Sequence, residues 1–177
     1  MSYSFYESTV PSLKACLESL RAILKEGEKH AASKSIPVDD IVAWRLVDDM
    51  LPLSFQVQMV TDIAMKFVAR VNEEPMEQWS TEFKTVADLY ARIDAAEAWL
   101  GKAKEETLAK RANETVELQM GPKIKKELPA KGWWAAYGEP NLYFHLTTAY
   151  TILRSKGVPL GKMNYIAPFT TGWFTVP

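Results

Sequence analysis

The sequence has one cysteine, no long apolar run and almost no net charge, and each shortage excludes a class of protein. Cys16 alone cannot form an intrachain disulfide, which suits a reducing compartment. No stretch approaches the roughly 18 uninterrupted apolar residues of a membrane span. The first residues lack the basic start and apolar run of a secretory signal. We therefore expect a cytoplasmic protein that has no membrane partner.

An excess of charge of one sign is also absent. The 177 residues include 21 basic and 22 acidic ones, for a net charge of −1. Such a balance gives no broad electrostatic attraction to nucleic acid or to anionic lipid. Lys123, Lys125 and Lys126 lie close together, but Glu127 interrupts them, which favours a solvated surface. We expect no nucleic-acid partner and a single domain with an ordinary core.

Three segments before residue 112 carry apolar residues at helical spacing. The first has them at spacings of 4, 3, 4, 3 and 4 and is expected to end over Gly27 and residues 31–35. The second begins around Asp48, tolerates Pro52 in its first turn and places Asp49 at or beside the N-cap. The third runs from about Thr81 to about Arg111. The apolar positions of the first segment are Tyr6, Val10, Leu13, Leu17, Leu20 and Leu24.

The pattern changes after residue 114. Apolar residues at 116, 118 and 120 alternate with polar ones, which predicts a short strand, and residues 124–128 return as a second strand after Gly121-Pro122. A fourth helix is expected to open between Gly138 and Asn141. It closes at Gly157, which is placed for a left-handed C-cap. The sequence thus predicts an all-α four-helix bundle with a small β-hairpin between the third and fourth helices.

The segment after the fourth helix differs in composition. Residues 157–166 contain too much glycine and proline for a helix, so we divide the chain into a bundle domain, 1–166, and an aromatic C-terminal tail, 167–177. The apolar residues of the tail are too many for a free terminus and are expected to pack on this chain or on a second copy. They are Phe169, Trp173, Phe174 and Val176.

The most informative feature is a polar stripe on the fourth helix. Asn141, His145 and Thr148 fall at i, i+4 and i+7 of an otherwise apolar helix. Buried polar groups need a protein partner, water or a ligand. Asp49 and Gln56, seven residues apart, share one face of the second helix. If the two faces meet, they bring together a carboxylate, an imidazole and two amides. Four aromatic residues are expected to supply the walls: Tyr143, Tyr150, Trp133 and Trp134.

Such a site suits a flat, hydrophobic or aromatic small molecule. Our leading hypothesis is a small-molecule pocket protein, with metal-independent acid–base catalysis by an isomerase, cyclase or dehydratase as the candidate reaction. His145 is then the acid or base, Asp49 orients it, and Gln56 and Asn141 hydrogen-bond the ligand. The alternative stays open that His145 is a core histidine, hydrogen-bonded to a carboxylate or a carbonyl.

Three motifs carry a resemblance to a known family. They are residues 49–53 with 56–58, residues 141–145 with 149–150 and 152–154, and residues 157–162. On these motifs the chain resembles a family of unknown function found in bacteria and fungi, within the DinB-like (YfiT-like) superfamily. The resemblance covers the chain to about Tyr165. It implies an up-and-down four-helix bundle with a cleft at one end, and often a homodimer, but no known reaction.

The resemblance also implies a metal in the cleft, commonly held by three histidines from two helices. This sequence has only His30 and His145, and Asn141 and Ala149 stand where a second ligand beside His145 is expected. Asp49 is the acidic replacement on the second helix. One imidazole and one carboxylate suit zinc or nickel poorly, so we expect no metal and no cofactor. Two other hypotheses remain open: a dimeric scaffold that works through its aromatic tail, and a bundle metalloenzyme with an altered metal site.

Overall fold

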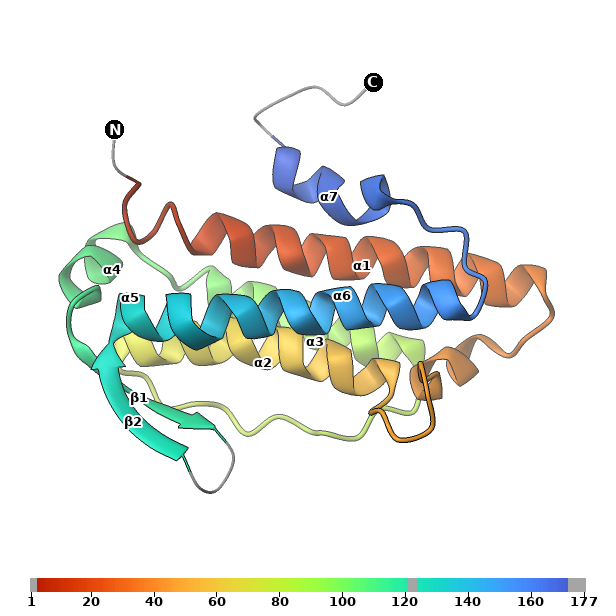
Figure 1. The fold of residues 1–177 in the computed structure, drawn as a ribbon, viewed down its shortest axis with the longest axis horizontal. Coiled ribbons are helices and arrows are strands. Elements are labelled where there is room, and N and C mark those ends of the chain that lie inside the picture. Colours follow the sequence, from red (N-terminus) through yellow and green to blue (C-terminus); the bar gives the residue numbers. More distant parts are fainter. Residues whose placement is uncertain (1–2, 121–123, 172–177) are drawn as a thin grey trace.

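Four long helices form the body of the protein (Figure 1). The computed structural model describes residues 3–120 and 124–171 of the chain. The bundle consists of α1 (Val10–Ser33), α2 (Leu53–Asn72), α3 (Val86–Leu100) and α6 (Glu139–Ser155). Its apolar seam residues are buried, as the sequence predicts for Leu13, Leu17 and Leu20. Within the part of the chain that the structure describes, no helix is long and apolar enough to cross a membrane.

The order of the helices differs from simple up-and-down alternation, because α2 and α3 run parallel. Midway along the pair, Asp62 of α2 contacts Arg92 of α3, and at the end Asn72 contacts Lys102, just beyond α3. Parallel neighbours cannot be joined by a tight turn. Residues 73–85 therefore run back along the bundle as an extended crossover, which is visible below α2 in Figure 1.

Gly27 is a packing position and does not end α1, which continues to Ser33. A Cβ atom at Gly27 would lie 2.9 Å from Cδ2 of Leu153, so the missing side chain lets α1 and α6 approach closely. The short 3-10 helix η1 (Val38–Ala43) then leads to α2. The helix thus ends within the expected segment 31–35, and only the part of the expectation that gave Gly27 a helix-ending role was wrong, because close packing also favours glycine.

Two other helix boundaries differ from those expected. Pro52 is the N-cap residue of α2, so the helix starts at Leu53, beyond Asp49. The expected helix from Thr81 to Arg111 is instead α3 followed by a separate α4 (Glu105–Arg111). A capping box starts α3 late: Thr85 Oγ1 accepts from the Asp88 backbone N–H, and the Asp88 carboxylate accepts from the Thr85 backbone N–H.

The hairpin is confirmed. Strand β1 (Thr115–Met120) pairs antiparallel with β2 (Ile124–Pro129), in a register that sets Thr115 opposite Pro129. It lies at one end of the bundle (Figure 1). From β2 the chain enters α5 (Ala130–Trp133), a π-helical turn (Trp134–Gly138) and then α6. At the far end of α6, Gly157 adopts φ +87°, the left-handed cap that the sequence predicts.

The segment after Gly157 contains a helix that the sequence analysis did not expect. Helix α7 (Lys162–Thr170) packs along α1, and Ser19 of α1 donates a hydrogen bond to the Tyr165 carbonyl. Tyr165 and Phe169 stack at 6.1 Å between ring centroids. Phe169 therefore packs on this chain, which is the first of the two alternatives expected for the tail, the other being a second copy. Trp173, Phe174 and Val176 lie outside the described residues.

Candidate functional site

The imidazole of His145 is turned into the bundle and is held by an amide of α2. Its Nδ1 lies 2.8 Å from Oε1 of Gln56. The amide nitrogen of Gln56 donates to the carbonyls of Leu51 and Pro52, at 3.1 and 3.4 Å. Because those carbonyls only accept, the Gln56 oxygen is left to accept from His145. Nδ1 therefore carries the proton, and Nε2 carries the lone pair.

Apolar surroundings keep this ring neutral. His145 is only 8 % exposed, and the rings of Phe55 and Phe144 meet it edge-on at 5.9 and 5.2 Å between centroids. Burial lowers the pKa of His145 to about 4, because the charged form loses its hydration. At neutral pH the ring is an uncharged hydrogen-bond donor.

Asp49 does not orient the His145 ring. It is exposed, and it forms no hydrogen bond or ion pair with any described residue. Since α2 begins only at Leu53, Asp49 lies outside the helix, and its seven-residue spacing from Gln56 no longer places both on one face. The expected His–Asp pair is replaced by a His–Gln pair, in which the partner cannot take up a proton.

Three of the four expected aromatic walls pack elsewhere. Tyr150 donates to the Leu160 carbonyl, at 3.4 Å, and meets Tyr165 edge-on. Tyr143 contacts Phe169 at 6.0 Å between ring centroids. Trp134 is buried against Phe67 in the core. These side chains leave α6 and the turn before it in different directions, so they do not surround His145.

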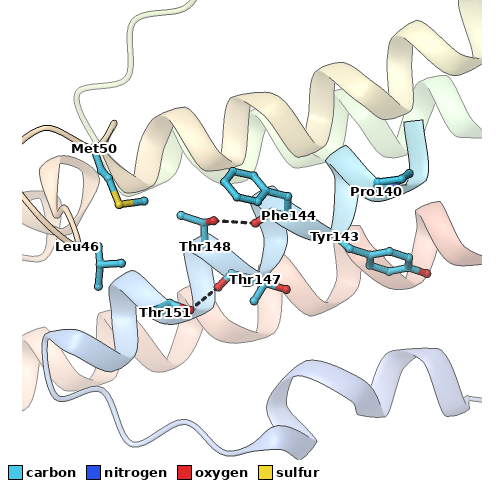
Figure 2. Close-up of a pocket in the computed structure, with 8 residues that line it drawn as sticks. All are labelled: Leu46, Met50, Pro140, Tyr143, Phe144, Thr147, Thr148 and Thr151. Atoms are coloured by element: carbon cyan, nitrogen blue, oxygen red, sulfur yellow. Dashed lines mark hydrogen bonds between the residues drawn. The ribbon is translucent and has the colours of Figure 1, made fainter. Parts of the chain in front are cut away.

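Thr148 lines a shallow groove on the exposed side of α6, with a volume of about 400 Å³ (Figure 2). Its hydroxyl donates to the Phe144 carbonyl, at 2.7 Å, and Thr151 bonds in the same way to Thr147. Both hydroxyls are thus already engaged, and no charged side chain lines the groove. It offers a ligand apolar contact but little to fix its orientation. The lining residues are Leu46, Met50, Pro140, Tyr143, Phe144, Thr147, Thr148 and Thr151.

A second hollow, of about 390 Å³, lies between α2, the crossover, β1 and the start of α6. We call it the Trp133 hollow. Two residues expected to bind a ligand line it, Trp133 and Asn141. Trp133 is 3 % exposed, and neither its Nε1–H nor the Asn141 Nδ2 group has a hydrogen-bond partner among the described residues. A buried donor without a partner costs roughly 1–3 kcal/mol and is uncommon. The lining residues are Met59, Asp62, Ile63, Lys66, Arg70, Met76, Glu117, Trp133, Tyr137 and Asn141.

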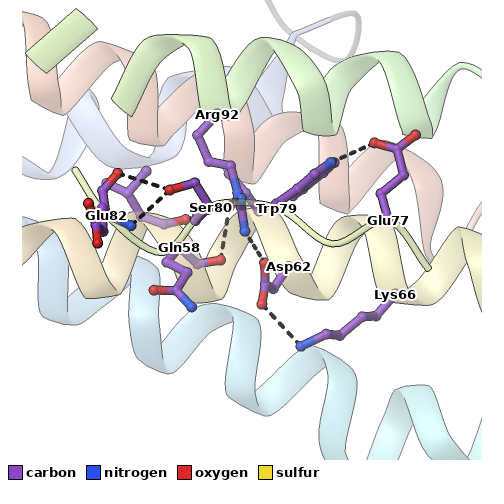
Figure 3. Close-up of polar contacts among 10 residues, drawn as sticks. Gln58, Asp62, Lys66, Glu77, Trp79, Ser80, Glu82 and Arg92 are labelled. Carbon is purple, nitrogen blue, oxygen red and sulfur yellow. Dashed lines mark hydrogen bonds and ion pairs between the residues drawn. The ribbon is translucent and has the colours of Figure 1, made fainter. Parts of the chain in front are cut away.

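The acids of the hollow already have partners. Figure 3 shows Asp62 between Arg92 of α3 and Lys66 of its own helix, the latter at 3.0 Å. Arg92 also lies over the ring of Trp79 in the crossover, 4.1 Å from its centroid, and donates to the Ser80 carbonyl. This cluster fixes the crossover on the bundle.

Arg70 differs from the other charged residues of the hollow in its partners, which are backbone carbonyls and an indole ring. Its guanidinium donates to two backbone carbonyls, those of Lys66 and Glu117, and lies 4.9 Å from the centroid of Trp133. The Glu117 carboxylate pairs with Lys125 instead, at 2.6 Å. Burial lowers the pKa of Arg70, yet the group starts so basic that it stays charged. In residues 3–120 and 124–171 it pairs with no carboxylate.

The π-helical turn sets the direction of Trp133. A Cβ atom at Gly138 would lie 2.8 Å from ring atoms of both Trp133 and Trp134, so only glycine leaves room for the two indoles. Such turns are often found at functional sites. Sequence reasoning treated Gly138 only as the opening of a helix, and it missed Arg70 and Lys66 in the hollow. The sequence feature that could have indicated this packing is Gly138 itself, five residues after Trp133 and four after Trp134.

The residues around His145 do not fit the metal that the resemblance implies. Gln56 is engaged by His145 and two carbonyls, and Ala149 has no donor atom. In the described part of the chain, no group of three or more His, Cys, Asp or Glu side chains is placed to hold a metal ion.

Comparison with known proteins gives a family and a fold. The model of the family described as Domain of unknown function (DUF1993) matches residues 5–166. The chain is also similar to a DinB family member protein from Shewanella denitrificans, known from a crystal structure, with 31% sequence identity between the two chains. Its similarity covers 97% of this chain and 95% of that one, with a TM-score of 0.84. No curated protein matches significantly. The family match includes both His145 and the Trp133 hollow.

Replacing Asp62 by alanine is expected to lower the free energy of unfolding by about 3–5 kcal/mol, because Arg92 is left as a buried, unpaired charge. Urea unfolding followed by circular dichroism measures the loss. Asp94→Ala is the matched control, since its pair with Arg21 is largely exposed, and it should cost at most about 1 kcal/mol. The double change Asp62→Leu and Arg92→Met should recover most of the loss. Equal effects of the two single changes would contradict a buried pair.

The neutral His145 ring predicts a pH dependence of stability. Between pH 6.5 and about 4 the unfolded chain takes up a proton that the folded chain does not, so stability falls as the pH falls through this window. The loss attributable to His145 is about 3 kcal/mol. His145→Asn keeps an N–H for Gln56 but cannot titrate, and should lack this part of the loss. Urea unfolding at pH 7 and pH 4.5 compares the two proteins, and parallel pH profiles would show that His145 is not the group responsible.

Proposed function

This chain belongs to the family described as Domain of unknown function (DUF1993), and from that premise we propose that it binds a small, partly apolar molecule in the Trp133 hollow. One observation carries the proposal. Trp133 and Asn141 both line this hollow, and each has a buried N–H group that lacks a partner in the described part of the chain. A ligand oxygen supplies the acceptor that the protein does not.

The size and lining of the hollow support this proposal. A volume of about 390 Å³ falls within the roughly 300–1,000 Å³ of small-molecule sites. Apolar contact comes from Met59 and Ile63 of α2 and from Met76 of the crossover. Aromatic faces come from Trp133, the last residue of α5, and from Tyr137 of the π-helical turn. A few polar groups on an apolar wall are what orients a bound molecule.

Acid–base catalysis by His145 has less support. An imidazole with a pKa of about 4 is a weak base at neutral pH, and its one remaining proton, on Nδ1, is already donated to Gln56. Asp49 is exposed and Gln56 cannot relay a proton. In this proposal the His145–Gln56 hydrogen bond has a structural role and fixes the spacing of α2 and α6. It lies one helical turn from the hollow residues Met59 and Asn141. We therefore propose binding before catalysis.

Binding predicts that the Trp133 indole N–H resonance moves on titration with an aromatic carbonyl compound. We expect at least one of benzamide, 2-naphthamide, benzoate and 2-naphthoate to shift this resonance saturably in ¹H–¹⁵N spectra, with Trp133→Phe used for its assignment. Met59→Trp fills the hollow and should abolish the shift. Met163→Trp, at an exposed position on α7, should leave it unchanged. The proposal fails if none of the four compounds moves the resonance, or if Met59→Trp binds like the parent.

We also propose that the cytoplasmic protein is a homodimer, as the resemblance implies. Large apolar side chains are exposed near the start of α2 and on α6: Phe144 at 61 %, Val47 at 51 % and Leu51 at 49 %. Together with the apolar groove of Figure 2, they form a surface that a second copy can cover.

Phe144→Ser is expected to shift the protein toward the monomer, because it removes the most exposed of these side chains. Light scattering during size-exclusion chromatography measures the mass, with Met163→Ser on α7 as the control. A parent protein that elutes as a monomer at micromolar concentration would rule out the dimer.

A further inference from the structure

We infer that the ligand of the Trp133 hollow is an organic monocarboxylate whose carboxylate pairs with Arg70. The inference rests on the proposed function and names the chemical class of its ligand. It comes from three residues that line one hollow: a cation that pairs with no carboxylate in the described chain, Arg70, and two residues with an unpartnered N–H group, Trp133 and Asn141.

Arg70 supplies the positive charge. Its two hydrogen bonds go to the carbonyls of Lys66 and Glu117, which satisfy N–H groups but do not neutralise the guanidinium. Lys66 differs, because it already has the Asp62 carboxylate at 3.0 Å. The Glu117 carboxylate acts on this partly buried guanidinium only through space and is itself paired with Lys125, so an anion bound in the hollow would be the first direct partner of the Arg70 charge among the described residues.

The number of donors favours a carboxylate over a neutral carbonyl. The residues Trp133, Asn141 and Arg70 all line the hollow, and the Trp133 Nε1–H and Asn141 Nδ2–H groups lack a partner among the described residues. A carboxylate has two oxygens and about four acceptor positions, whereas an amide or ketone has one oxygen with two. Only the carboxylate can both accept from these three side chains and balance the charge of Arg70.

The rest of the hollow limits what the carboxylate is attached to. Met59, Ile63 and Met76 favour an apolar or aromatic body over a free inorganic anion. Asp62 and Glu117 also line the hollow, and they would repel a second negative charge on the ligand. These contacts together select a compound with one carboxylate and an apolar body.

The test compares two probes of nearly equal shape, 2-naphthoate and 2-naphthamide, by titration calorimetry. The parent protein is expected to bind the acid about tenfold or more tightly than the amide. Arg70→Met should bind both probes equally and retain the parent's affinity for the amide, which shows that the hollow is intact. Lys29→Met removes the same charge from an exposed position on α1 and should keep the preference.

Each result has one meaning. Equal affinity of the parent for acid and amide, with the Trp133 resonance shifted by both, overturns the carboxylate inference and leaves the small-molecule proposal standing. Binding of neither probe overturns both. A preference for the acid that survives in Arg70→Met removes Arg70 from the site. If Arg70→Met does not fold, Arg70→Gln retains a donor for the backbone carbonyls without the charge, and the same criteria apply to it.

Discussion

The bundle depends on the requirement that polar groups buried along α2 find partners on the neighbouring elements. Gln56 meets His145 of α6, and Asp62 meets Arg92 of α3. Each contact fixes the register of one helix against α2, since a polar group shifted by one turn would be buried alone. The same requirement is not met on the side facing the hairpin, where Trp133 and Asn141 lack partners in the described chain. Two of the three buried side-chain N–H groups that lack a partner in the described chain belong to residues of the Trp133 hollow, the third being Arg111 Nε, and this is the physical ground for proposing a ligand there.

The topology explains why the hollow forms at this position. Parallel α2 and α3 require the extended crossover 73–85, and the Arg92 cluster fixes that segment on the bundle (Figure 3). The crossover brings Met76 to one side of the hollow, and the hairpin brings Glu117 to another. The hollow is therefore a consequence of helix order, and the family match over residues 5–166 includes every element that bounds it.

Periodicity and local chemistry predicted much of the fold, including the apolar seam of α1, the hairpin and the cap at Gly157. They failed where two physical roles use the same residue type: Gly27 packs against Leu153 and does not end a helix. At the site, the polar stripe of α6 correctly indicated a buried His145. The choice of Gln56 over Asp49 as its partner depends on where α2 begins. Arg70 was missed because its position beside Trp133 joins segments far apart in sequence, and no local pattern records such a contact.

Trp133 lines the hollow and belongs to an aromatic cluster with Trp134 and Phe67. Phe67 of α2 contacts both indoles, at 6.4 Å from the Trp133 centroid and 5.2 Å from that of Trp134. The face presented to a ligand is thus the outer surface of the central packing, which resists rearrangement because interiors are close-packed. Ligands of different size or shape would have to be matched by the opposite side of the hollow, which the crossover and the hairpin form. Under the proposed function, differences in ligand among DUF1993 proteins should be concentrated in those two segments, while the indole pair and its glycine, Gly138, stay fixed.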